Sequence, residues 1–347
     1  MSNETKNNAA VENKAAADET VLEVKNLVVQ YVLKESTVEA VNDISFSLKA
    51  GHAIGLVGET GAGKTTTALA ILNLVPDPPG VIQQGEITVC GNPVLKLSPR
   101  ELQHIRGKDV SMIFQDPMTS LNPVLTVGEQ IAESVRLHEN LSPAKAYERA
   151  IEMLELVGIP GARADNYPHQ FSGGMKQRVV IAIALACNPK VLIADEPTTA
   201  LDVTIQAQVL SMMNDLKEKF NTALVMITHD LGVVAKMCDD VAVMYAGRIV
   251  ESGTLEDIYN NTMHPYTEGL FNSLPRINNK GVALKPIPGL MVDPSNLPKG
   301  CAFADRCSYA TEKCFESRPE VRHVTETHTV CCCRYDEPDF HIEGVID

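Results

Sequence analysis

The sequence predicts an α/β protein with a parallel β-sheet at its core, and three observations support this fold class. Two continuous apolar runs, VLIAD at 191–195 and ALVMITHD at 223–230, each follow a segment with helical spacing, which is typical of parallel strands joined by crossover helices. A glycine-rich loop at 58–66 lies between an apolar strand and a helix. Short β-rich runs from Val21 onward predict a smaller sheet that precedes this loop.

The composition excludes several classes of protein. The 347 residues include 44 acidic and 30 basic side chains, so the formal net charge is −14 and binding to nucleic acid or to an anionic membrane surface is disfavoured. The longest apolar run, Val179–Cys187, is shorter than the about 20 residues that a membrane-spanning helix needs. The first 20 residues lack a basic start followed by an apolar stretch, so we expect no secretory signal and a cytoplasmic protein.

The chain divides into three predicted regions. Residues 1–20 are rich in Asn, Ala, Glu and Lys and predict a disordered tail. Residues 21–259 predict the main domain, with a helical insertion at about 116–170 and a final strand pair joined through Ala246-Gly247. Residues 260–347 contain many prolines and six of the nine cysteines, and they predict an irregular extension.

The glycine-rich loop matches the Walker A pattern in its strand-to-helix setting. Its residues are the predicted nucleotide contacts Gly58, Glu59, Thr60, Gly61, Ala62, Gly63, Lys64, Thr65 and Thr66. Glycines allow successive backbone N–H groups to point at phosphates, and the following helix adds the positive end of its dipole. Lys64 is expected to reach the β- and γ-phosphates, and the Thr65 hydroxyl to bind Mg²⁺. The full pattern favours an ATP site over a plain tight turn.

Two acids end the apolar run at 191–195 and complete this site. Asp195 fits the Walker B position that holds Mg²⁺, and Glu196 follows it directly. Because strand ends in an α/β sheet deliver their residues to the ligand crevice, Glu196 is expected to act on the attacking water as general base or positioning group.

The string FSGGMKQ at 171–177 resembles the signature motif of ATP-binding cassette (ABC) ATPases, and the resemblance extends over residues 21–335. It implies a P-loop NTPase of ABC type, with a RecA-like core sheet, an antiparallel β subdomain and a helical insertion, followed by the irregular cysteine-rich extension. It also implies that the signature motif of one subunit contacts ATP held by the Walker A loop of the other. The signature residues are Ser172, Gly173 and Gly174.

Four further residues match ABC landmarks in the order that the family has them. Gln115 matches the Q-loop, which contacts Mg²⁺ or the lytic water and senses the membrane subunits. Asp202 matches the D-loop, His229 matches the switch histidine that contacts the γ-phosphate, and Tyr31 matches the aromatic residue that stacks on adenine. The resemblance therefore implies Glu196, His229 and Gln115 as the catalytic group.

Longer strings resemble the ATP-binding subunits of dipeptide and oligopeptide importers (DppD/OppD-like), namely QDPMTSLNPVLTVGEQI, YPHQFSGGMKQRV, HPYTEGLFNSLP and LPKGCAFADRC. This resemblance implies an ATPase at the cytoplasmic face of the membrane. Its implied partners are two transmembrane permease subunits, a paralogous ATPase that favours a heterodimer, and an extracytoplasmic solute-binding protein. Importers of nickel, glutathione or other solutes share much of the pattern and remain the alternative. A soluble ABC protein of DNA repair or ribosomes, and a regulator that only binds ATP, are disfavoured.

The clustered cysteines form a separate signal. Cys301, Cys307 and Cys314 are followed by a triplet at 331–333, and in a reducing compartment such density favours metal ligation over disulfides. The importer resemblance implies a [4Fe–4S] cluster whose fourth ligand aligns with Cys332. Zinc is the alternative, disfavoured because no C-x-x-C pair is present, and a loose extension with solvent-facing thiols is the third possibility.

Overall fold

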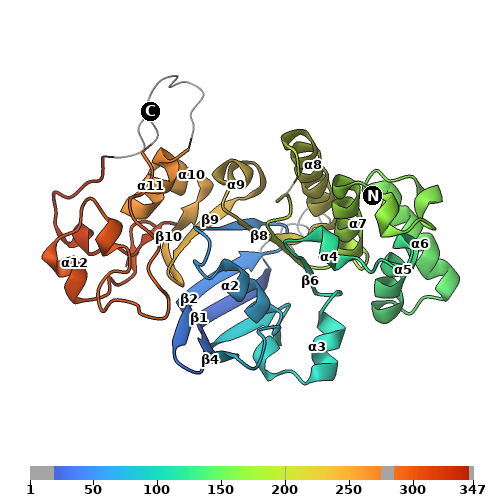
Figure 1. Ribbon diagram of the computed structural model, residues 1–347, viewed down its shortest axis with the longest axis horizontal. Helices are drawn as coiled ribbons and strands as arrows, with labels where there is room; N and C mark the ends of the chain where they lie inside the picture. Colours follow the sequence, from blue (N-terminus) through green and yellow to red (C-terminus); the bar gives the residue numbers. More distant parts are fainter. Residues whose placement is uncertain (1–18, 200, 275–284, 344–347) are drawn as a thin grey trace, which may run out of the picture.

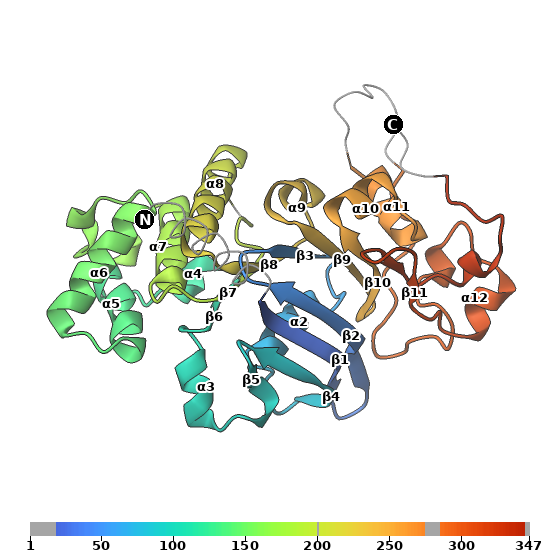
Figure 2. The ribbon, with the colours of Figure 1, turned by 180° about the vertical axis from the view of Figure 1, so that it is seen from behind.

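The computed structural model describes residues 19–199, 201–274 and 285–343. Figure 1 shows a central sheet with the helices α5, α6 and α7 at one end and the extension around α12 at the other, while the antiparallel sheet of β1, β2 and β4 lies below the centre. Figure 2 shows the same arrangement from behind. Across the described ranges, every helix is too short or too polar to span a membrane. Most of the predicted tail at 1–20 lies outside the described residues, and the first strand begins at Thr20.

The larger sheet has eight strands in the order β11-β12-β10-β9-β3-β8-β7-β6. Its strands are β3 Ala53–Val57, β6 Val110–Ile113, β7 Val191–Asp195, β8 Ala223–Thr228, β9 Asp240–Tyr245, β10 Arg248–Thr254, β11 Arg322–His323 and β12 Thr329–Val330. The strands from β9 to β6 pair in parallel, and every residue of β3, β7 and β8 is buried. The predicted α/β class with a parallel core sheet is confirmed, because strands buried on both faces have continuous apolar sequences.

The smaller sheet is antiparallel and has the order β2-β1-β4-β5. Its strands are β1 Thr20–Val32, β2 Thr37–Lys49, β4 Gly80–Val89 and β5 Asn92–Pro93. Leu22, Leu27 and Val29 of β1 are fully buried and contribute to a core shared with β3 and the helix that follows it. This shared core fixes the small sheet against the start of the glycine-rich loop.

The helices cover the faces and ends of the sheets. The α-helices are α2 Lys64–Ile71, α3 Pro99–Ile105, α4 Pro117–Ser120, α5 Val127–His138, α6 Pro143–Leu156, α7 Gly173–Leu185, α8 Val203–Phe220, α9 Leu231–Met237, α10 Leu255–Asn260, α11 Pro265–Asn272 and α12 Glu312–Glu316. The 3₁₀-helices are η1 Val94–Lys96, η2 Gly161–Arg163, η3 Pro168–Gln170, η4 Ala304–Arg306 and η5 Cys333–Asp336. The insertion predicted at about 116–170 holds α4, α5 and α6.

The extension does not pack as a separate unit, since β12 pairs with β10 of the main sheet. The buried carboxylate of Glu251 in β10 accepts hydrogen bonds from the backbone N–H groups of Met263 (2.7 Å) and His264 (3.0 Å), and it lies 2.9 Å from Nε2 of His328. A buried carboxylate needs such partners, because an unpaired charge in the interior is strongly destabilising. The division at residue 260 remains a prediction, and across it the two regions share one sheet.

Candidate nucleotide-binding site

Four neighbouring strands direct the predicted site residues to one edge of the large sheet. The glycine-rich loop follows β3, His229 follows β8, Glu196 follows β7, and Gln115 comes shortly after β6. Because these strands are parallel, their carboxyl ends meet at the same edge, where α/β sheets bind their ligands. Residues separated by more than 100 positions in the sequence are thereby brought together.

The backbone of the glycine-rich loop requires glycine at two positions. Gly63 has φ +100°, and a Cβ there would lie 2.3 Å from the carbonyl oxygen of Ala40. Gly58 has φ +156°, and a Cβ there would lie 2.2 Å from the carbonyl oxygen of Met244. A side chain at either position would therefore displace backbone atoms, which explains why this loop tolerates only glycine there.

Lys64 is buried at the centre of the loop. Its Nζ donates to the carbonyl oxygens of Gly58 (2.6 Å) and Glu59 (3.0 Å). Burial lowers the pKa of Lys64, and the carboxylates of Glu196 and Asp195 act in the opposite direction. The ammonium group is thus held where the loop curls around it, as a lysine that binds phosphate requires.

A pocket of about 930 Å³ opens beside this loop. Its lining includes most of the predicted nucleotide and catalytic residues, namely Tyr31, Thr60, Gly61, Gly63, Lys64, Thr65, Thr66, Gln115, Asp195, Glu196 and His229. Val38, Ala40 and Pro294 also line the pocket, and the sequence analysis did not single them out. Gly58, Glu59 and Ala62 belong to the loop but not to the lining. The pocket thus gathers groups for phosphate, metal and water at one place.

Glu196 lies at the centre of a hydrogen-bond network. Its carboxylate accepts from Nε2 of Gln115 (2.9 Å) and Oγ1 of Thr199 (2.9 Å), and it lies 3.0 Å from Nδ1 of His229. Burial alone would raise the pKa of Glu196, but the hydrogen bonds from His229, Thr199 and Gln115 outweigh it and hold the pKa below its usual range. Glu196 is therefore an ionised hydrogen-bond acceptor at neutral pH. Thr199 is a partner that no motif indicated.

Asp195 is the more buried of the two acids, at 3% exposed. Burial raises its pKa, while a hydrogen bond from the Thr65 side chain lowers it. Glu196 next to it has φ +46°, a left-handed conformation that turns the chain sharply after β7. This turn separates the two neighbouring acids, so Asp195 pairs with Thr65 while Glu196 faces Gln115 and His229.

The signature residues lie apart from this pocket. Ser172 caps α7 by accepting from the N–H of Met175, and Asp202 caps α8 by accepting from the N–H of Ile205. Ser172, Gly173, Gly174 and Asp202 line a second pocket, of about 1080 Å³, which shares no lining residue with the first. Residue 200 of the predicted D-loop lies outside the described residues. Two separate half-sites on one chain are what the ABC resemblance implies.

In the part of the chain that the structure describes, no group of three or more His, Cys, Asp or Glu residues is placed to hold a metal ion. Sγ of Cys314 lies 3.3 Å from Sγ of Cys333, which is not the predicted fourth ligand. Burial raises the pKa of Cys307 to about 11 and that of Cys332 to about 12. Burial therefore favours the thiol form of both groups, whereas a metal is bound by thiolate.

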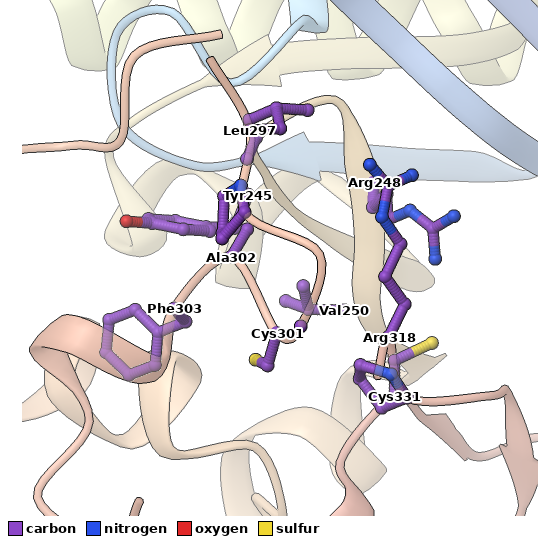
Figure 3. A pocket seen from close by; sticks show the side chains of 13 residues that line it. Tyr245, Arg248, Val250, Leu297, Cys301, Ala302, Phe303, Arg318 and Cys331 are labelled. Carbon is purple, nitrogen blue, oxygen red and sulfur yellow. The ribbon is translucent and has the colours of Figure 1, made fainter. Parts of the chain in front are cut away.

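Two other cysteines line a small pocket between β10 and the extension. Figure 3 shows Tyr245, Phe303 and Cys301 on one side of it and Arg248, Arg318 and Cys331 on the other. The thiols of Cys301 and Cys331 point in different directions in this view. The two thiols do not converge on a common point, so Cys331 is not placed to bind one metal together with Cys301.

The fold and the two half-sites define the class of protein, an ABC ATPase. The family model described as "ABC transporter" matches residues 41–199, and the one described as "Oligopeptide/dipeptide transporter, C-terminal region" matches residues 250–314. The chain is 52% identical to the oligopeptide transport ATP-binding protein OppD of Bacillus subtilis (strain 168), and the match covers 89% of this chain and 87% of that protein. The chain therefore belongs to the family of ATP-binding proteins of oligopeptide and dipeptide transporters.

Another relative and a solved structure agree with this family. The dipeptide transport ATP-binding protein DppD of Bacillus subtilis (strain 168) is 47% identical over 93% of this chain and 97% of that protein. The ATP-binding cassette MJ0796, solved as a dimer bound to ADP and phosphate, is 28% identical to this chain, with a TM-score of 0.61. The match covers 67% of this chain and 98% of the MJ0796 chain. The cassette fold is shared, while the remaining third of this chain lies outside that match.

Proposed function

We propose that this chain binds and hydrolyses ATP to drive the import of di- or oligopeptides through a separate transmembrane permease pair. The observation that carries the proposal is the Glu196 carboxylate, held by Gln115, Thr199 and His229 at the wall of the glycine-rich-loop pocket. The match of residues 250–314 to the peptide-transporter C-terminal region supports the peptide substrate.

In this proposal each group at the site has a separate task. Backbone N–H groups of the loop and Lys64 bind the phosphates, and Tyr31, whose hydroxyl lies 3.4 Å from Oγ1 of Thr66, stacks on adenine. Glu196 orients the attacking water and accepts its proton, and His229 contacts the γ-phosphate. The pocket thus offers a lysine for the phosphates, a carboxylate for the attacking water and an aromatic ring for the base.

Mg²⁺ fits the oxygen donors of the site. Thr65, Gln115 and Asp195 offer a hydroxyl, an amide carbonyl and a carboxylate, which are ligands that a hard cation prefers. When bound, Mg²⁺ neutralises charge on the phosphate oxygens. The Gln115 amide nitrogen donates to Glu196, so its carbonyl oxygen is the atom left for the metal.

The partners follow from the two half-sites. Ser172, Gly173 and Gly174 contact ATP held by a second ATPase, and we propose a paralogous subunit that forms a heterodimer. The pair docks on two permease subunits at the cytoplasmic face of the membrane and works with an extracytoplasmic solute-binding protein. Gln115 lies between the end of β6 and the start of α4, where the helical insertion joins the core sheet, and this position supports a role for the Q-loop in sensing the permease.

Reconstitution of the chain with its permease, partner ATPase and binding protein in liposomes tests the proposal. Labelled di- and oligopeptides are expected to enter only with ATP, and peptide-loaded binding protein should raise ATP turnover severalfold. Uptake of nickel or glutathione instead of peptides would overturn the peptide assignment in favour of the alternative importers. Peptide uptake without ATP hydrolysis by this chain would overturn its enzymatic role.

We further propose a [4Fe–4S] cluster in the extension, bound by Cys301, Cys307, Cys314 and Cys332, with zinc as the alternative. Support comes from the proximity of these cysteines and Cys333, which lie near enough for a charge on one to raise the pKa of another. The raised thiol pKa values oppose it, because each thiol must lose its proton to become a ligand. When bound, such a cluster cross-links a segment that has little regular secondary structure.

Anaerobically purified protein is expected to be brown, with iron and acid-labile sulfide each at about four per chain. Cys301→Ser, Cys307→Ser or Cys314→Ser should each remove most of the colour, whereas Cys90→Ser in the small sheet should not. Cys332→Ser tests the fourth ligand against Cys333→Ser, because Sγ of Cys333 lies 3.3 Å from Sγ of Cys314. Stoichiometric zinc without iron after anaerobic reconstitution would contradict the cluster.

A further inference from the structure

The extension reaches back to the nucleotide pocket. Pro294 lines that pocket, and its carbonyl oxygen accepts a hydrogen bond from the N–H of Glu39 (2.8 Å). Sδ of Met291, another residue of the extension, lies 3.7 Å from the point where a Cβ on Gly61 would stand. The extension therefore forms part of the surroundings of the glycine-rich loop.

Arg306 makes the strongest of these contacts. Its Nη1 and Nη2 donate to the two carboxylate oxygens of Glu59, at 2.6 and 3.0 Å, in a bidentate ion pair. Nε of Arg306 donates to the carbonyl oxygen of Pro288 (2.8 Å), and Nη1 lies 3.4 Å from the Tyr245 hydroxyl. The Arg306 side chain is 6% exposed and that of Glu59 is 34% exposed. The pair thus joins a fixed guanidinium to a partly exposed loop carboxylate.

Glu59 is also held through its backbone. Its N–H donates to the hydroxyl of Tyr266 (2.9 Å), and its carbonyl oxygen accepts from Nζ of Lys64 (3.0 Å). Tyr266 is fully buried and packs against Tyr245 and Phe303, with ring centroids 4.7 and 5.3 Å apart. Hydrogen bonds therefore hold Glu59 through its side chain, its N–H and its carbonyl group. The partner of the carbonyl group is Lys64, the lysine expected to bind phosphate.

We propose that Arg306 is a positioning residue for ATP binding, which acts through Glu59 to hold the glycine-rich loop in its phosphate-binding form. The loop binds phosphates through its backbone, so its geometry sets the affinity, and a loop held in advance loses less conformational freedom on binding. Arg306 is the last residue of η4 and directly precedes Cys307, so its side chain joins the cysteine-bearing segment to the glycine-rich loop. No nucleotide motif includes Arg306, which lies 247 residues from Glu59.

Arg306→Met in the full-length chain, assembled with its transporter partners, tests the proposal. The Kd of a fluorescent ATP analogue and the KM for ATP are expected to rise about 5- to 20-fold, with kcat within about twofold, because ground-state binding is lost while Glu196 is untouched. Arg306→Lys should restore only part of the affinity, since an ammonium group cannot make the bidentate pair. Glu59→Gln should weaken ATP binding in the same direction as Arg306→Met.

A double variant and a control variant test whether Arg306 affects ATP binding through Glu59. The double variant, Arg306→Met with Glu59→Gln, should have about the same ATP affinity as whichever single variant binds ATP less tightly, because both substitutions remove the same interaction. Arg322→Met removes an exposed ion pair to Asp336 (2.5 Å) elsewhere in the extension and should leave ATP affinity unchanged. ATP affinity within twofold of wild type in Arg306→Met, despite a lower melting temperature, would overturn the proposal, as would additive losses in the double variant. If Arg306→Met does not fold, Glu59→Gln and Arg306→Lys carry the same test.

Discussion

Replacement of Glu196 by Gln is expected to slow ATP hydrolysis by about two to four orders of magnitude while ATP affinity stays within about twofold of wild type. The amide preserves the size of the side chain and can still accept a hydrogen bond through its carbonyl oxygen, but it cannot take a proton from water. The three donors around Glu196 make the carboxylate form dominant at neutral pH, so this acceptor is the group that the substitution removes. The variant should therefore also prolong the life of the ATP-bound dimer.

Two measurements test this prediction. Turnover of the assembled transporter gives the rate of ATP hydrolysis, and binding of a fluorescent ATP analogue gives the affinity. Glu86→Gln is the matched control, because Glu86 is an exposed residue of β4 in the other sheet and should retain wild-type turnover. Hydrolysis by Glu196→Gln within about threefold of wild type would remove Glu196 from the catalytic role.

Replacement of Lys64 by Ala is expected to lower ATP affinity by about two orders of magnitude, because two charge-assisted hydrogen bonds to phosphate are lost. Lys64 is 7% exposed, and its ammonium lies inside the loop beside the carbonyl oxygens of Gly58 and Glu59. Alanine suits a helix start, so α2 should persist. Binding is therefore expected to fall far more than stability.

Isothermal titration with ATP and thermal unfolding of the same samples separate these two effects. Lys236→Ala, at an exposed position of α9, is the control that removes a lysine far from the loop. Retention of ATP affinity within threefold in Lys64→Ala would contradict the phosphate-binding assignment of the whole 58–66 loop.

Local patterns in the sequence were sufficient to predict the core strands and the phosphate-binding loop of this protein. A buried parallel strand must be apolar throughout, so VLIAD and ALVMITHD indicate β7 and β8 directly. A phosphate-binding loop needs glycines, a lysine and a hydroxyl in consecutive positions, so the motif at 58–66 is readable without any long-range information. The acid that ends β7 and the histidine that follows β8 are expected at the same sheet edge because the two strands are parallel.

The buried face of a helix is harder to read from the sequence than a buried strand. Tyr147, Ile151 and Leu154 of α6 have helical spacing, but only Leu154 is fully buried, while Tyr147 and Ile151 are partly buried. The stripe beside it contains the fully buried Ala146, Ala150 and Met153. Adjacent stripes on a helix have the same period, and only the packing of α5 and α7 decides which of them faces inward.

The tertiary structure alone decided how the extension meets the ATP site. Glu59 was expected to contact nucleotide, yet its carboxylate pairs with Arg306, and Pro294 completes the pocket wall. The expected fourth cysteine, Cys332, is not the one beside Cys314, which is Cys333. The sequence by itself therefore determined the strands, the phosphate loop and the family, because each of these features depends on short stretches of neighbouring residues. The contacts of the irregular extension have no period and no fixed spacing, so only the folded path of the chain brings them together.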